Sequence, residues 1–125
     1  DELDPKFVGA ARVEYNQRKA LEGADFVYAK NWAAYTDPNY GKVLSRDRAW
    51  TVDAEKMALT NNARFMHCLP AFHDLNTTIG KQISEKYGLD AMEVTDEVFE
   101  SSQSIVFDEA ENRMHTIKAV MAATL

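Results

Sequence analysis

The feature that most constrains the fold is an alternation of short apolar runs, rich in β-branched and aromatic residues, with segments of helical periodicity. This alternation is typical of βαβ units, in which a helix connects two parallel strands. The run at 25–29 has almost no polar face, as expected for a strand buried on both sides. We therefore predict an α/β fold of three layers, a mainly parallel sheet with helices on both faces. The expected strands are 11–15, 25–29, 64–69 and 104–107.

Capping residues place the helices between these strands. Helix 16–22 is expected to end at Gly23, and Asp53 is expected to begin a helix that runs to about residue 59. A third helix should end at Gly88, and Asp108, with an acidic residue three positions on, should cap a terminal helix. The apolar residues expected to be buried are Leu75, Ile79, Ile83 and Tyr87 in the third helix, and Ala110, Met114, Ile117 and Met121 in the terminal helix.

Size and composition exclude several functions. The 125 residues correspond to one domain. The net charge of −6 argues against nucleic-acid binding, which needs a basic face. No apolar run reaches the ~18 residues that cross a bilayer, and residues 1–4 do not resemble a signal peptide. One cysteine, Cys68, allows no internal disulfide. We therefore expect a soluble, cytoplasmic protein with neither nucleic-acid nor membrane partners.

The strongest local feature is His67-Cys68-Leu69-Pro70, at the carboxyl end of the predicted strand 64–69. In open α/β sheets, ligands bind outside the carboxyl ends of strands. A neutral imidazole can donate a hydrogen bond to a carbonyl oxygen, and an exposed thiol can contact an amine or act as a nucleophile. A buried structural cysteine beside a hydrogen-bonded histidine explains the pair equally well. A Cys–His hydrolytic dyad is disfavoured, because adjacent strand residues point to opposite faces.

Two cations are candidates for anion binding. Arg113 is expected in the first turns of the terminal helix, where a guanidinium suits phosphate or carboxylate, although an ion pair with Asp108 or Glu109 is the alternative. Lys30 directly follows the strand at 25–29 and precedes a predicted long loop at 33–50; its alternative is a solvated lysine.

The remaining polar residues suggest no further chemistry. His73 and His115 share no metal-ligand spacing with each other or with carboxylates, and no glycine-rich phosphate loop occurs, so no metal or other cofactor is expected. Eight acidic residues and no basic residue lie between Asp90 and Asn112, a pattern that indicates a solvated edge and helix N-termini.

Three segments carry a specific resemblance: FMHCLP at 65–70, EVTDEVFE at 93–100 and FDEAENRMH at 107–115. Together they strongly resemble the carboxyl-terminal, amino-acid-binding domain of ornithine carbamoyltransferases, and the similarity covers essentially the whole chain. The resemblance implies an incomplete Rossmann-like domain and transfer of a carbamoyl group from carbamoyl phosphate to an amine, without metal or organic cofactor.

The resemblance also implies roles for individual residues. His67 would hydrogen-bond the carbamoyl oxygen, and His67 and Cys68 would be the catalytic pair. Carbamoyl phosphate would contact His67, Cys68, Leu69 and Arg113. The amino-acid substrate would contact Lys30, Cys68, Leu69 and Pro70.

Two subfamilies are represented along the chain. Residues 3–66, with YAKNW at 28–32 and NYG at 39–41, look like N-succinylornithine and N-acetylornithine carbamoyltransferases, whose chain threads a knot near the active site. A positive Lys30 would suit an acylated substrate that has lost its α-ammonium charge. Residues 67–125, with AFHD at 71–74, look like the ornithine enzymes. The change between the two motivates the hypothesis of a mosaic, either an engineered hybrid or an unusual natural branch.

The sequence also lacks motifs of the family. Neither the Ser-Thr-Arg-Thr loop nor the His-Pro-x-Gln segment of the amino-terminal, carbamoyl phosphate-binding domain occurs. Residues 1–125 are thus expected to form a single, partial domain that is inactive alone, since half a cleft cannot position both reactants. The alternatives are a non-catalytic folding or threading unit and a free-standing small-anion binding module. Apolar surface and an unpaired strand edge should cause self-association into a homo-oligomer.

Overall fold

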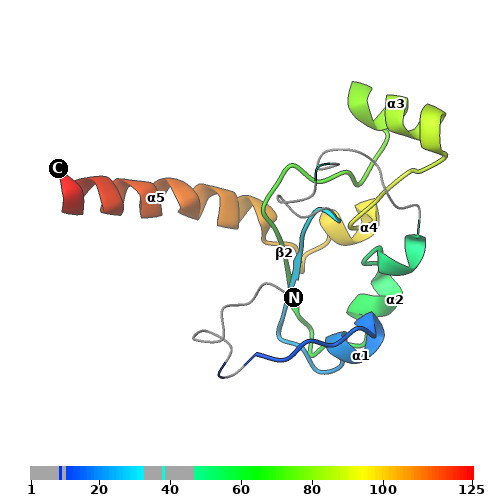
Figure 1. The fold of residues 1–125 in the computed structure, drawn as a ribbon, viewed down its shortest axis with the longest axis horizontal. Helices are drawn as coiled ribbons and strands as arrows, with labels where there is room; N and C mark the ends of the chain where they lie inside the picture. The colour runs from blue at the N-terminus through cyan, green and yellow to red at the C-terminus, as the bar shows by residue number, and fades with distance from the viewer. Residues whose placement is uncertain (1–8, 10, 33–37, 39–46) are drawn as a thin grey trace.

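A computed structural model of the chain describes residues 9, 11–32, 38 and 47–125 (Figure 1). Most of the predicted loop at 33–50 lies outside these residues. Within the described part, no helix is both long and apolar enough to cross a membrane. The elements are α1 (Gln17–Leu21), β1 (Phe26–Ala29), the 3-10 turn η2 (Arg48–Trp50), α2 (Ala54–Met57), β2 (Arg64–His67), α3 (Thr78–Tyr87), α4 (Asp96–Phe99) and α5 (Val106–Thr124).

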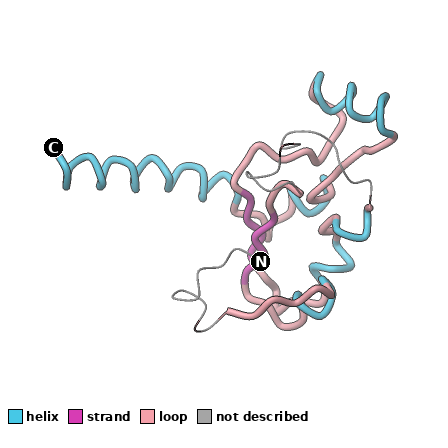
Figure 2. Tube along the Cα trace, viewed as in Figure 1, coloured by secondary structure: helices cyan, strands magenta, loops and turns pink. Residues whose placement is uncertain are grey.

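The two strands form a parallel sheet, drawn in magenta in Figure 2. Their register places Ala29 opposite His67, so both strands end at the same edge. On its other side, β2 contacts the segment before α5: the Phe65 N–H donates to the Gln103 carbonyl, and the Phe65 carbonyl accepts from the Ile105 N–H. A mixed α/β fold with parallel strands is confirmed, and the expected strands 25–29 and 64–69 are present in shorter form.

The other two predicted strands are wrong. Residues 11–15 form no strand, and all but one of them are exposed. A strand needs a neighbour, and none of the described segments pairs with these residues. At 104–107, only Ser104 forms a bridge, to Phe65, and α5 begins at Val106. The described residues therefore contain a sheet of two strands instead of four.

Most helix caps are confirmed. The Asp53 side chain accepts the Lys56 N–H at the start of α2. Gly88 ends α3 with a φ of 70°, in the left-handed region where a Cβ would be strained, and its N–H donates to the Ser84 carbonyl. The expected cap at Asp108 is wrong, since Ile105 takes the N-cap position and Asp108 lies in the first turn of α5.

The predicted burial is wrong for the apolar stripe of α5 and only partly met in the third helix, where Ile83 and Tyr87 are half-buried. Leu75 precedes α3, and Ile79 within it is largely exposed. In α5 only Val106 is buried, and Ala110, Met114, Ile117 and Met121 are all exposed. Figure 1 gives the reason for α5: beyond its first turns, the helix projects away from the other elements. Its periodicity is helical, but the described residues supply no surface for its apolar side chains.

One face of the sheet is open as well. Phe26 and Tyr28 in β1 are 66% and 53% exposed, so the expectation of a strand covered on both faces is wrong for this chain. The opposite face is covered by the core, whose buried residues are Leu21, Val27, Val52, Met57, Ala63, Phe65, Val94, Val98, Phe99 and Val106.

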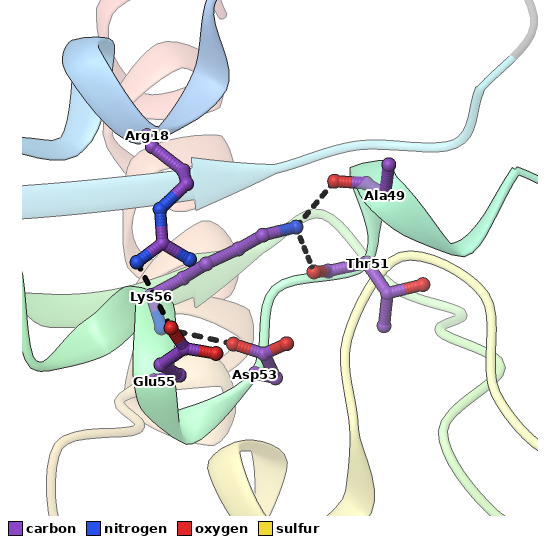
Figure 3. Close-up of polar contacts among 6 residues, drawn as sticks. All are labelled: Arg18, Ala49, Thr51, Asp53, Glu55 and Lys56. Atoms are coloured by element: carbon purple, nitrogen blue, oxygen red, sulfur yellow. Dashed lines mark hydrogen bonds and ion pairs between the residues drawn. The ribbon is translucent and has the colours of Figure 1, made fainter.

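A buried lysine joins α2 to the turn before it (Figure 3). The Nζ atom of Lys56 donates to the carbonyls of Ala49 and Thr51, the latter at 2.6 Å. Burial lowers the pKa of Lys56, although nearby acidic groups, Asp53 foremost, oppose this effect. On the surface of the same helix, Glu55 forms an ion pair with Arg18 at 2.9 Å and so connects α2 with α1.

Candidate functional site

The carboxyl ends of β1 and β2 bring most of the candidate residues to one edge. Lys30 follows Ala29 and is exposed, while Cys68 follows His67 and is half-buried. Leu69 is also half-buried, with a φ of 47° that is rare for a residue other than glycine, and Pro70 is exposed. The parallel register therefore places both chain segments after the strands side by side, as the strand predictions require.

His67 is the most buried of these residues, with an exposed fraction of 1%. Its Nδ1 atom accepts the Leu69 N–H at 2.9 Å, so the neutral ring carries its proton on Nε2. The Nε2 atom is buried and has no hydrogen-bond partner among the described residues. Burial lowers the pKa of His67, against the opposing charges of Glu93 and Glu109. The site thus contains a neutral imidazole with one unused N–H donor.

Three further side chains gather beside His67 and Cys68. Oε2 of Glu109, in the first turns of α5, accepts the His67 main-chain N–H at 3.2 Å. The Tyr28 side chain lies near the Glu109 carboxylate and the Cys68 thiol, and both act on its pKa. Burial, then the hydrogen bond and charge of Glu109, raise the pKa of Tyr28 to about 12. Glu93 is buried, and its carboxylate accepts the Phe72 N–H at 3.4 Å.

Sequence reasoning did not identify Tyr28, Glu93 or Glu109 as parts of the site. For Glu93 the interpretation of the acidic stretch as a solvated edge is wrong, because this side chain is buried. One signal pointed to Glu109: it precedes Arg113 by four residues, which places both on one face of a helix.

Arg113 is exposed, about two turns into α5. Within the described chain its guanidinium forms no ion pair, so the alternative of a pair with Asp108 or Glu109 is not observed. An exposed guanidinium without an ion-pair partner can bind an anion that approaches from solvent.

A cavity of about 510 Å³ lies elsewhere, and none of the candidate residues lines it. Its charged lining includes Arg48, Asp53, Asp74, Asp90 and Asp96. Arg48 forms an ion pair with Asp90 at 2.9 Å, so part of the acidic charge is already compensated.

Near this cavity, the expectation that His73 lies apart from carboxylates is wrong. The fold brings His73, Asp96 and Glu100 together so that their possible metal-ligating atoms lie within 4.8 Å of one another, a proximity invisible in the sequence. The Nδ1 atom of His73 is 2.8 Å from Asp96, and its ring stacks on Phe99 with centroids 3.7 Å apart. The imidazole therefore has structural partners of its own, and the two carboxylates are exposed.

Comparison with known proteins agrees with the resemblance. Residues 6–124 match the model of the aspartate/ornithine carbamoyltransferase family, Asp/Orn binding domain. The chain is 56% identical over 124 residues to N-succinylornithine carbamoyltransferase of Bacteroides fragilis, covering 99% of this chain and 34% of the relative. It is 49% identical to an ornithine carbamoyltransferase of Borreliella burgdorferi, covering 94% of this chain and 36% of the relative. The chain thus spans about a third of the length of these relatives.

Solved structures give the same answer. The fold superposes on ornithine carbamoyltransferase from Pyrococcus furiosus with a TM-score of 0.62 and 32% identity, covering 86% of this chain and 29% of that one. It superposes on an N-acetyl-L-ornithine transcarbamylase mutant, complexed with carbamyl phosphate and N-succinyl-L-norvaline, with a TM-score of 0.60 and 39% identity. That match covers 89% of this chain and 30% of the other. The chain therefore belongs to the aspartate/ornithine carbamoyltransferase family and corresponds to its Asp/Orn binding domain.

Proposed function

We propose that this chain is the amino-acid-binding part of an enzyme that transfers the carbamoyl group of carbamoyl phosphate to the δ-amine of ornithine or an N-acylornithine. The observation that carries the proposal is the buried, neutral His67 with an unused Nε2–H donor at the carboxyl edge of the sheet. Attack of a neutral amine on the carbamoyl carbon develops negative charge on the carbamoyl oxygen. A fixed donor at that oxygen lowers the barrier, because the charge develops where the hydrogen bond already points.

The other residues of the edge take the roles that the resemblance implies. Cys68 and Leu69 line the junction between carbamoyl phosphate and the amino acid, and Pro70 contacts the amino acid. Arg113 contributes positive charge to carbamoyl phosphate, and Lys30 contacts the amino-acid substrate. The exposure of Lys30 and Arg113 supports these roles, since both groups can meet ligands from solvent.

An amino-terminal domain supplies the second wall of the site in this proposal. The chain matches about a third of the length of its relatives, and Tyr28, beside this edge, is 53% exposed although His67 itself is buried. Half a site cannot exclude water or hold both reactants in line. We therefore expect the 125 residues alone to have no transferase activity above background.

Between ornithine and an acylated ornithine, sequence similarity and the charge of Lys30 favour the acylated substrate. The match to the N-succinylornithine enzyme extends over 124 residues and includes Lys30, whose positive charge suits the extra carboxylate of a succinyl group. A mosaic origin remains a separate hypothesis; one continuous match of this length supports a single branch at least as well.

The test uses a reconstituted enzyme, in which this chain replaces the matching residues of the Bacteroides fragilis relative. We expect it to carbamoylate N-succinylornithine or ornithine, and we expect the isolated chain to carbamoylate neither. His67→Phe keeps a ring but removes the donor, so kcat should fall about 100-fold or more. His115→Phe, at an exposed position of α5, is the matched control and should retain the parent kcat.

Two results would contradict the proposal. Turnover by the purified 125-residue chain would show that no second wall is needed. A folded reconstituted enzyme that is inactive with both substrates, or one in which His67→Phe has the parent kcat, would remove the assigned reaction.

A further inference from the structure

Glu109 stands where the hydrogen-bond ladder beside β2 stops. Phe65 exchanges two main-chain hydrogen bonds with Gln103 and Ile105, each 2.9 Å long. If this parallel ladder continued, the next donor, the His67 N–H, would bond to the Ile105 carbonyl. That carbonyl instead accepts the Glu109 N–H at 2.9 Å, as the first turn of α5.

The Glu109 side chain supplies the acceptor that the ladder lacks. Its Oε2 atom takes the His67 N–H at 3.2 Å, while its own N–H is bonded to Ile105. The same residue thus closes the first turn of α5 and supplies the last acceptor beside β2. The acceptor is a carboxylate, so the bond is charge-assisted, although at 3.2 Å it is longer than the 2.9 Å bonds of the ladder before it.

A second contact connects the same carboxylate to the neighbouring strand. The Tyr28 side chain in β1 lies close enough to the Glu109 carboxylate and to Cys68 for both to raise its pKa. Glu109 therefore contacts β1 and the last residue of β2 through its side chain, and the start of α5 through its main chain. Arg113 follows four residues later, on the same face of the helix.

We propose that Glu109 is a positioning residue, which fixes the main chain of His67 and sets the register of α5, and thus of Arg113, against the strand ends. The catalytic part of this proposal rests on the proposed function. The structural part, that the Glu109 carboxylate ends the β2 ladder, does not depend on that function. Two measurements separate these two parts.

The first measurement uses the 125-residue chain without ligand. Glu109→Ala removes the acceptor, so hydrogen exchange of the His67 amide should accelerate about 10-fold or more. Glu109→Gln keeps an acceptor and should stay within about threefold of the parent rate. Glu111→Ala, an exposed position two residues along α5, is the matched control and should leave this rate unchanged.

Spectroscopic titration of Tyr28 adds a readout that depends on charge. Both Glu109 variants remove the negative charge, so the pKa of Tyr28 should fall part of the way from about 12 toward 10.0, since burial, the largest cause of the shift, remains. The control variant should titrate like the parent. A parent-like His67 exchange rate in folded Glu109→Ala, or a Tyr28 titration unchanged in Glu109→Gln, would overturn the proposal.

The second measurement uses the reconstituted enzyme. A small displacement of His67 should lower kcat about 100-fold in Glu109→Ala, and raise KM much less, because positioning acts on the transition state. Glu109→Gln should recover most of the rate. Parent-like kcat in Glu109→Ala would overturn the positioning role in catalysis. An inactive parent enzyme would contradict the proposed function instead, and the exchange rates would still decide whether Glu109 holds His67.

Discussion

The imidazole of His67 combines two properties that a donor to a carbonyl oxygen needs. It is neutral because burial lowers its pKa, and its tautomer is fixed because the Leu69 N–H occupies Nδ1. The tautomer is set locally, by a residue two positions along the chain, whereas the burial depends on distant segments such as the start of α5. The sequence therefore predicts where the imidazole lies, at the end of a strand, but not how deeply it is buried.

The lowered pKa of His67 predicts the pH dependence of stability. The unfolded imidazole takes up a proton near pH 6.5, whereas the folded one takes it up only at lower pH. Between these values the unfolded state binds more protons, so the free energy of unfolding should fall as the pH falls through this window. Above pH 6.5 the full stability should be present. Urea denaturation of the chain across this range measures the effect.

Two substitutions test whether His67 causes this pH dependence of stability. His67→Gln should flatten the pH dependence below pH 6.5, because the titrating ring is gone. His115→Gln, at an exposed position of α5, should retain the slope of the parent. Equal slopes in His67→Gln and the parent would contradict the assignment.

The buried Lys56 leads to a second prediction at this scale. Lys56→Met keeps the volume of the side chain but removes the donor from the Ala49 and Thr51 carbonyls. Leaving buried acceptors unpaired costs about 1–3 kcal/mol, so the free energy of unfolding should fall by that amount in urea at neutral pH. Arg18→Met, which breaks the exposed ion pair with Glu55, is the control and should cost less than about 1 kcal/mol. A Lys56→Met variant as stable as the parent would show that this network contributes nothing.

At the scale of elements, most local capping signals were confirmed, Asp108 excepted, whereas only two of the four expected strands found a partner. Asp53 and Gly88 act through hydrogen bonds to residues three or four positions away, so the sequence contains the whole interaction. The strand expected at 11–15 depended on a partner elsewhere in the chain, which its alternation could not specify. Glu109 illustrates the same limit within the site, since its contact with His67 joins residues 42 positions apart.

Two glycines of α3 provide a matched test of element packing. A Cβ at Gly80 would lie 2.6 Å from the Asp74 carbonyl oxygen and 3.1 Å from the Phe72 ring. A Cβ at Gly88 meets nothing within 4 Å, but its φ of 70° is strained for alanine. Gly88→Ala should therefore cost about 1 kcal/mol, and Gly80→Ala more, despite the higher helix propensity of alanine. Thermal unfolding measures both; a stabilised Gly80→Ala variant would contradict the packing of α3 on residues 72–77.

At the scale of the whole molecule, the family could be inferred from three motifs, whereas the burial of entire faces could not. Periodicity reports which side of a helix is apolar, but it does not report what covers that side. The described chain buries one face of the sheet and leaves apolar residues of β1 and α5 in solvent. This imbalance is the physical basis for proposing that a second domain completes the protein.

Exposed apolar surface also predicts self-association of the isolated chain. Met114, Ile117 and Met121 repeat along one side of α5, and each is about half exposed. We expect sedimentation velocity to detect a dimer or a larger species. Ile117→Lys should shift the chain toward monomer, whereas Ala119→Lys, with the same charge on the opposite side of the helix, should not. A parent chain that sediments as a clean monomer would contradict this prediction.

The projection of α5 has a practical consequence for experiments. The helix has 19 residues, or about 28 Å of length, and the turns beyond Arg113 are held by their own hydrogen bonds. The unsupported part, residues 114–124, is shorter than the ~12–15 residues below which isolated helices are marginal in water, so we expect the distal turns to fray in the isolated chain. Docking on a partner surface would suppress that fraying. The far-ultraviolet helical signal of α5 would then serve as a built-in gauge of assembly, readable without any label or substrate.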